Sequence, residues 1–149
     1  MPEINSTIAS MSIPQTRYFS NKASDYDDAV NLTLGVPDFD TDPLIKQALV
    51  DAFVDKKSLK YSHNTGLIEL RQAISDYYFN KYQVHFDPED QIIVTAGGSE
   101  AIDSSLRTIL EKGDQVIIPQ PAYPAYQAIV TMLGCEVIPI DTSETNFVL

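Results

Sequence analysis

The sequence has 149 residues, of which 44% are hydrophobic and 21% are charged, a composition typical of a soluble globular protein. Its formal net charge of -11 at pH 7 repels nucleic acid and anionic membrane, so we expect neither as a partner. The single cysteine, Cys135, excludes an intramolecular disulfide, and no signal peptide or long apolar run is visible. We therefore expect a cytoplasmic protein, and we expect no metal site.

The first part of the chain is polar and weakly patterned as far as about residue 29. Its scattered apolar residues suit an arm that lies against another surface. Apolar and polar residues then alternate over 30–34, which predicts a strand. A turn rich in glycine and proline follows from Gly35.

A helix is predicted to begin after Asp42, because an aspartate at the N-cap followed by Pro43 is a frequent helix start. Apolar residues at helical spacing carry it to about residue 57, where Lys56 and Lys57 suit the negative end of the helix dipole. After the polar loop 60–66, a second helix is predicted to about Tyr82. Its apolar face consists of Leu67, Leu70, Ile74 and Tyr77.

Short apolar strands alternate with helices in the second half of the chain. The strands are predicted at 92–95, 116–118 and 137–140, and the helices at about 101–110 and 125–133, with Gly113 and Gly134 closing them. This order, with fully apolar strands, predicts an α/β protein with a parallel sheet covered on both faces. Three strands form a small sheet, so the domain looks incomplete.

The loop that joins the first of these strands to its helix contains Gly97, Gly98 and Ser99. It places backbone N–H groups and a hydroxyl at a helix N-terminus, where an anion is favoured. A plain tight turn between a strand and a helix is an equally good interpretation of this loop alone. Its glycine spacing differs from that of a Walker loop and of the dinucleotide fingerprint.

Tyr123 lies between Pro121 and Pro124, just after the next strand. In an open parallel sheet, ligands bind outside the carboxyl ends of the strands. Two prolines fix the backbone around the ring, which suits stacking on a flat ligand, although packing on a neighbouring loop is an alternative. Together the glycine loop and Tyr123 predict a planar, phosphorylated ligand.

Several segments of the sequence, in this order, resemble class I and II aminotransferases of fold type I, which depend on pyridoxal 5'-phosphate (PLP). These segments are 34–39 (Leu-Gly-Val-Pro-Asp-Phe), 61–66 (Tyr-Ser-His-Asn-Thr-Gly), 70–74 (Leu-Arg-Gln-Ala-Ile), 93–102 (Ile-Val-Thr-Ala-Gly-Gly-Ser-Glu-Ala-Ile), 113–116 (Gly-Asp-Gln-Val) and 121–124 (Pro-Ala-Tyr-Pro). Within the family, the sequence is most similar to the bacterial branch that acts on N-acetyl-diaminopimelate or aromatic amino acids.

The resemblance implies a fold and a division of the chain. Residues 1–57 would form the N-terminal arm and a segment of the small domain. Residues 58–149 would form the first part of the PLP-binding large domain, a truncated three-layer sheet. The implied substrates are an amino acid and a 2-oxo acid, and the implied assembly is a homodimer. An incomplete sheet also favours self-association.

The resemblance also implies roles for single residues. Gly97, Gly98 and Ser99 would hold the cofactor phosphate, and Tyr123 would stack on the pyridine ring. Tyr61 would reach the phosphate of a second subunit, and Gly35 would lie near the substrate carboxylate. Arg71 belongs to the family pattern too, but an ion pair on a helix surface is the preferred interpretation of this residue.

The family's catalytic lysine, which bonds to the cofactor and moves the proton, has no match here, so no catalytic residue is assigned. We interpret the lysines of this sequence as charges on the surface: Lys22, Lys46, Lys56, Lys57, Lys60, Lys81 and Lys112. We therefore expect an inactive N-terminal part of an aminotransferase. One alternative is a non-enzymatic remnant that binds a phosphorylated ligand or a protein partner. An unrelated nucleotide-binding domain is disfavoured by the glycine spacing.

Overall fold

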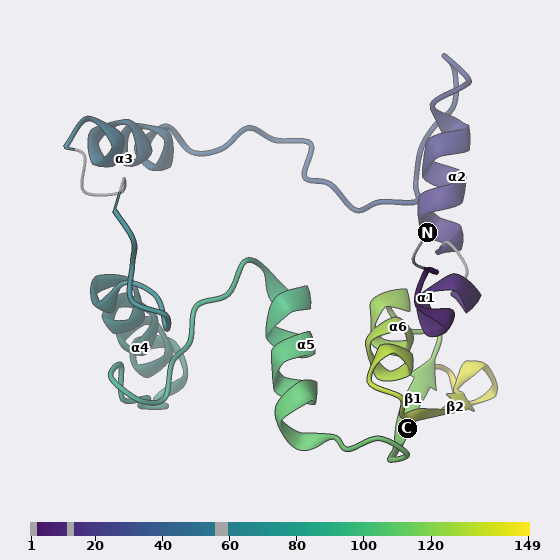
Figure 1. The fold of residues 1–149 in the computed structure, drawn as a ribbon. Coiled ribbons are helices and arrows are strands. Elements are labelled where there is room, and N and C mark those ends of the chain that lie inside the picture. The colour runs from purple at the N-terminus through teal and green to yellow at the C-terminus, as the bar shows by residue number, and fades with distance from the viewer. Residues whose placement is uncertain (1–2, 12–13, 56–59) are drawn as a thin grey trace. The chain divides into compact units, whose positions relative to one another are not determined.

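A computed structural model describes residues 3–11, 14–55 and 60–149. The chain forms two compact units (Figure 1). One unit contains residues up to Gly35 together with Gly97–Leu149, and the other contains Val36–Ala96. The predicted end of the first helix, with Lys56 and Lys57, lies outside the described residues.

The centre of the first unit is a parallel pair of strands, β1 (Gln115–Gln120) and β2 (Glu136–Asp141). Helix α6 (Pro124–Met132) connects them and packs against both. The buried apolar residues of this unit come from β1 and α6: Ile118, Ile129 and Val130. The two predicted strands and their crossover helix are therefore confirmed, with the helix closed by Gly134 at a φ of 74°.

Helix α5 (Gly98–Ile109) precedes β1 and contacts α6. It ends at Ile109, and its C-cap is Leu110, whose amide donates to the Leu106 carbonyl, so the expectation that Gly113 closes this helix is wrong. Gly113 instead serves the turn before β1, where it has a φ of 96° and its amide donates to the Gly134 carbonyl at 3.0 Å. A glycine fits such a turn because it has no Cβ to clash at positive φ.

Two short helices, α1 (Ser6–Ser10) and α2 (Gln15–Ala23), form in the region expected to be an irregular arm. The side chain of Asn5 caps α1 by accepting from the amides of Thr7 and Ile8, and α1 contacts α6. These helices were not predicted, because their apolar residues show no clear helical period.

The strand predicted at 30–34 is absent, so that prediction is wrong. The Asn31 side chain accepts from the Thr33 amide at 3.0 Å and from the Thr33 hydroxyl at 2.7 Å. Such a local turn gives the backbone a partner other than a neighbouring strand. Val30 and Leu32, the apolar members of the alternation, are exposed.

The second unit holds α3 (Pro43–Val54) and α4 (Ile68–Tyr82). The predicted start of α3 is confirmed, because the Asp42 carboxylate accepts from the Leu44 amide at 2.8 Å with Pro43 in the first turn. Helix α4 ends at Gln83, which adopts the left-handed conformation with a φ of 58°.

Residues 92–95, predicted to be a strand, form no strand and pair with none, so this prediction is also wrong. The Val94 amide donates to the Thr65 carbonyl at 2.9 Å, an isolated bond rather than one rung of a ladder. Ile92 is nevertheless buried, which accounts for its apolar character. Among the described residues no helix is long and apolar enough to span a bilayer, and no three metal-binding side chains cluster.

Candidate cofactor-binding site

The turn that starts α5 has a backbone conformation that glycine alone adopts readily. Gly97 is the N-cap, with a φ of 95° and a ψ of 167°. This combination is essentially closed to residues with a Cβ. A Cβ placed on Gly97 or Gly98 would meet nothing within 4 Å, so the glycines serve backbone shape and not tight packing. The turn is therefore an exposed segment at a helix end whose backbone shape depends on glycine.

The N-terminus of α5 is chemically suited to a phosphate. The first amides of a helix point out of its end and carry the positive end of the helix dipole. Ser99 adds a hydroxyl in the first turn and is exposed. Glu100 adds an opposing negative charge to the same turn. Since α5 has 12 residues, its dipole is developed, and the residues present fit a phosphate group.

Tyr123 lies where the sequence placed it, between the end of β1 and the start of α6. Its side chain is 57% exposed, and its ring meets that of Tyr126 edge to face with centroids 5.6 Å apart. The ring thus has one aromatic neighbour, and the side chain keeps an open surface. The ring can therefore stack on a flat ligand.

The backbone on both sides of Tyr123 is anchored. Pro124 occupies the first turn of α6. On the other side, the Gln120 carbonyl at the end of β1 accepts from the Thr142 amide at 3.0 Å and from the Thr142 hydroxyl at 2.8 Å. Thr142 is buried, so this junction is fixed from inside the unit.

The structure brings the glycine turn and Tyr123 into one unit. Helix α5 and strand β1 run in opposite directions, so the start of α5 and the carboxyl end of β1 face the same end of this unit (Figure 1). This is the edge at which ligands bind in open parallel sheets. Gly35 is an exposed residue at the border of the same unit.

Tyr61 belongs to the other unit, and its side chain is fully exposed. It precedes Gly66, whose φ of 97° turns the chain toward α4. Within this loop the His63 ring nitrogen Nδ1 lies 2.8 Å from the Thr65 hydroxyl and 3.3 Å from the Thr65 amide. The loop is thus internally bonded, while Tyr61 projects from it.

The described lysines that make polar contacts show no sign of an activated amine. Lys46 pairs with Asp40 at 2.5 Å, and both side chains are largely exposed. Lys81 donates to the Tyr77 hydroxyl at 2.7 Å, and hydrogen bonds to Tyr77 and Tyr82 raise its pKa above the usual 10.5. A nucleophilic lysine requires a lowered pKa, so the shift at Lys81 has the wrong direction.

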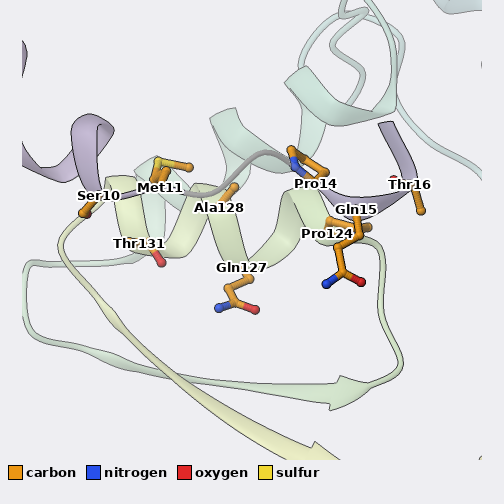
Figure 2. Close-up of a pocket in the computed structure, with 9 residues that line it drawn as sticks. All are labelled: Ser10, Met11, Pro14, Gln15, Thr16, Pro124, Gln127, Ala128 and Thr131. Carbon is orange, nitrogen blue, oxygen red and sulfur yellow. The ribbon is translucent and has the colours of Figure 1, made fainter. Parts of the chain in front are cut away.

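A hollow of about 550 Å³ lies beside α6 (Figure 2). Its described lining residues are Ser10, Met11, Pro14, Gln15 and Thr16 on one side and Pro124, Gln127, Ala128 and Thr131 of α6 on the other. None of these described side chains is charged, and Gly97, Ser99 and Tyr123 are not among them. Among the residues that the structure describes, it therefore offers a phosphate no cationic side chain.

Arg71 differs from its expected role. The sequence favoured an ion pair on a helix surface, but the residue is only 4% exposed, so that interpretation is wrong. Its guanidinium donates to the carbonyls of Gly66, Pro88 and Glu89. Arg71 and Ser75 are four residues apart, share a face of α4 and are both buried in the structure.

The protein-family comparison matches residues 27–149 to the family Aminotransferase class I and II. The chain is 39% identical over 146 residues to a probable N-acetyl-LL-diaminopimelate aminotransferase of Bacillus subtilis, an alignment that covers 98% of this chain and 37% of that protein. It is 35% identical to an aspartate aminotransferase of Pyrococcus horikoshii, covering 87% of this chain and 33% of the relative. The chain thus spans about a third of the length of these curated relatives.

Solved structures agree with this assignment. The aspartate aminotransferase of Thermus thermophilus with maleate superposes with a TM-score of 0.90 at 32% identity, covering all of this chain and 40% of that one. The substrate-bound BacF structure from Bacillus subtilis gives a TM-score of 0.89 at 26% identity. The fold is therefore part of the PLP-dependent aminotransferase fold, and the chain belongs to the class I and II aminotransferases.

Proposed function

We propose that this chain supplies the phosphate-holding and ring-stacking part of a PLP-dependent aminotransferase that moves an amino group between an amino acid and a 2-oxo acid. The observation that carries the proposal is Gly97, whose glycine-only backbone conformation shapes an exposed turn at the start of α5. Tyr123, in the same unit, supports it as an exposed aromatic ring.

Each residue has a definite task in this proposal. The amides around Gly97, Gly98 and Ser99, with the Ser99 hydroxyl, bind the phosphate dianion at the positive end of α5. Tyr123 orients the pyridine ring by stacking. Tyr61 contributes its hydroxyl to the phosphate bound by a second copy, and Gly35 lets the substrate carboxylate approach the backbone. When bound, the cofactor withdraws electrons from the substrate carbon that exchanges its proton.

The remaining parts of the proposal concern the whole protein. The division into 1–57, an arm with a small-domain segment, and 58–149, the start of the large domain, is part of it. We also propose a homodimeric assembly, a cytoplasmic location and a substrate that is either N-acetyl-diaminopimelate or an aromatic amino acid. The similarity to an N-acetyl-LL-diaminopimelate aminotransferase supports the substrate class. We assign no catalytic lysine among these 149 residues.

A calorimetric titration tests the binding part of the proposal. The probe is pyridoxamine 5'-phosphate, because its amine cannot react with surface lysines as the aldehyde of PLP does. We expect binding of pyridoxamine 5'-phosphate and at least tenfold weaker binding of pyridoxamine, which lacks the phosphate. Equal affinity for the two compounds would contradict a phosphate site at α5.

Two variants of Tyr123 test the stacking part. Tyr123→Phe keeps the aromatic face and is expected to bind like the unaltered chain. Tyr123→Ala removes it and is expected to bind roughly fivefold or more weakly, since stacking of a ring on an aromatic side chain contributes about 1 kcal/mol or more. If both variants bind equally well, Tyr123 does not touch the ring.

A further inference from the structure

Arg71 is a buried cation whose partners are all neutral. It extends from α4, is 4% exposed, and donates through Nε to the Gly66 carbonyl at 3.3 Å. Its Nη1 donates to the Glu89 carbonyl at 3.1 Å and to the Pro88 carbonyl. Among the described residues the ion pairs join Lys46 to Asp40 and Arg107 to Asp103, and none involves Arg71.

The acceptors of Arg71 come from two different segments. Gly66 lies in the loop before α4, whereas Pro88 and Glu89 lie in the turn after it. One guanidinium therefore joins the loop before α4 to the turn after it. A guanidinium suits this task because its five N–H groups are fixed in one plane.

The turn after α4 is held together by its own hydrogen bonds, so it provides an anchor. The Gln91 amide donates to the Asp87 carbonyl at 2.9 Å, and the Gln91 side chain accepts from the Asp87 amide at 2.8 Å. The Ser75 hydroxyl, one turn along α4 from Arg71, donates to the Phe86 carbonyl at 2.5 Å. Bonds from both Arg71 and Ser75 thus fix this turn to α4.

The hydrogen bonds of Arg71 form a clamp between the Gly66 loop and the turn after α4. At Gly66 this clamp also contacts the segment that leads to the glycine turn. The Thr65 carbonyl accepts from the Val94 amide, and a Cβ placed on Gly66 would lie 2.7 Å from the Val94 Cβ. The loop is therefore packed closely on Val94, which is three residues before Gly97. Tyr61 stands five residues before Gly66, with its side chain fully exposed.

From these contacts we propose that Arg71 is a positioning residue that holds the loop carrying Tyr61 against the segment leading to the glycine turn. The inference rests on the proposed function where it concerns the cofactor phosphate. Arg71 acts through the backbone of Gly66, and Tyr61 is the group that it positions. Without the guanidinium, the Gly66 carbonyl loses its anchor and the loop moves as a unit.

Hydrogen exchange tests the clamp without any ligand. The Gly66 amide donates to the His63 carbonyl and the Val94 amide to the Thr65 carbonyl, both at 2.9 Å, so each reports on the loop. In Arg71→Ala we expect both amides to exchange at least tenfold faster, and in Arg71→Lys we expect an intermediate rate. Arg107→Ala, which removes an exposed arginine of α5, is the matched control and leaves both rates unchanged.

The outcomes of that experiment separate a local clamp from a general structural role. Unchanged exchange at Gly66 and Val94 in Arg71→Ala would overturn the proposal. The proposal would also be overturned if amide exchange became equally faster along all of α4 in both Arg71→Lys and Arg71→Ala. That result would show that the whole unit depends on Arg71.

Titration with pyridoxamine 5'-phosphate tests the link to Tyr61. We expect Arg71→Ala and Tyr61→Phe each to weaken binding several-fold, and the double variant to bind no more weakly than the weaker single variant. If the double variant instead loses affinity by the product of the two single losses, Arg71 does not act through Tyr61. If the unaltered chain does not bind the probe, the proposed function fails, and the exchange rates still decide whether the clamp exists.

Discussion

Replacing Gly97 by alanine is expected to destabilise the chain even though the space around this residue is open. With a φ of 95° and a ψ of 167°, Gly97 lies in a region of backbone conformation that is strained for any residue with a Cβ. A Cβ there would meet no atom within 4 Å, so packing adds nothing to the effect. The cost is therefore the backbone strain alone, about 1–3 kcal/mol.

That cost can be measured against a neighbouring control. Gly98 is the first residue of α5, has no unusual φ, and also has open space around its Cβ position. Gly98→Ala is expected to leave the free energy of unfolding unchanged or to raise it by about 0.4–1 kcal/mol, because alanine restricts the unfolded chain. The two variants differ by one methyl group each, at adjacent positions with opposite backbone requirements.

Urea unfolding followed by circular dichroism provides the assay. We expect Gly97→Ala to lower the midpoint and Gly98→Ala to leave or raise it, with the slope against urea unchanged in both. A loss of about 1–3 kcal/mol corresponds to roughly a fivefold to hundredfold rise in the ratio of unfolded to folded chain. Equal midpoints for the two variants would show that the turn relaxes to a conformation open to alanine, and the argument for a preformed phosphate site would fail.

Other expectations can be checked on the same purified chain. It is expected not to convert an amino acid and a 2-oxo acid in the presence of PLP, and steady turnover would refute this. It is expected to self-associate in light scattering, because large apolar side chains such as Leu44, Leu49 and Phe53 of α3 are exposed, and a monodisperse monomer would count against that. Asp42→Ala removes the cap of α3 and is expected to cost about 0.5–2 kcal/mol in urea unfolding, whereas loss of the exposed Asp51 is expected to cost less. Hydrogen bonds from Ser143 hold the pKa of Asp141 below its ordinary 3.8, so its contribution to stability is present above that pH and is lost as the pH falls through the lowered pKa. Asp141→Asn is expected to remove that acid dependence, and an unchanged acid limb in the unfolding curve would contradict it.

Features encoded by neighbouring residues were predicted well from the sequence. The start of α3 at Asp42 and Pro43 depends on a few adjacent residues, and the structure confirms it. The same holds for the crossover from β1 through α6 to β2, in which Gly134 closes the helix. The glycine turn at Gly97 and the exposed Tyr123 were also expected at these positions. Each of these features is determined by a few residues that are adjacent in the sequence.

Features that depend on distant partners were predicted less well. A strand exists only where another strand pairs with it, and residues 30–34 and 92–95 have the composition of strands but no ladder partner. Arg71 shows the same difficulty for a side chain. Its acceptors at Pro88 and Glu89 lie 17 and 18 residues further along the chain, and backbone carbonyls carry no signature in the sequence. A charged residue on a helix therefore looked like a surface residue.

The geometry of the site also explains why binding without turnover is expected of this chain. The α5 turn would contact the phosphate, whose bonds do not change during the reaction, and Tyr123 would hold the ring in place. Contacts of this kind strengthen binding of the ground state and the transition state equally, so they do not raise the rate of the chemical step. Proton transfer requires a group whose pKa lies near the working pH. Lys81 has its pKa raised by Tyr77, away from that range. An affinity for pyridoxamine 5'-phosphate without conversion of substrates is thus the behaviour that these residues predict.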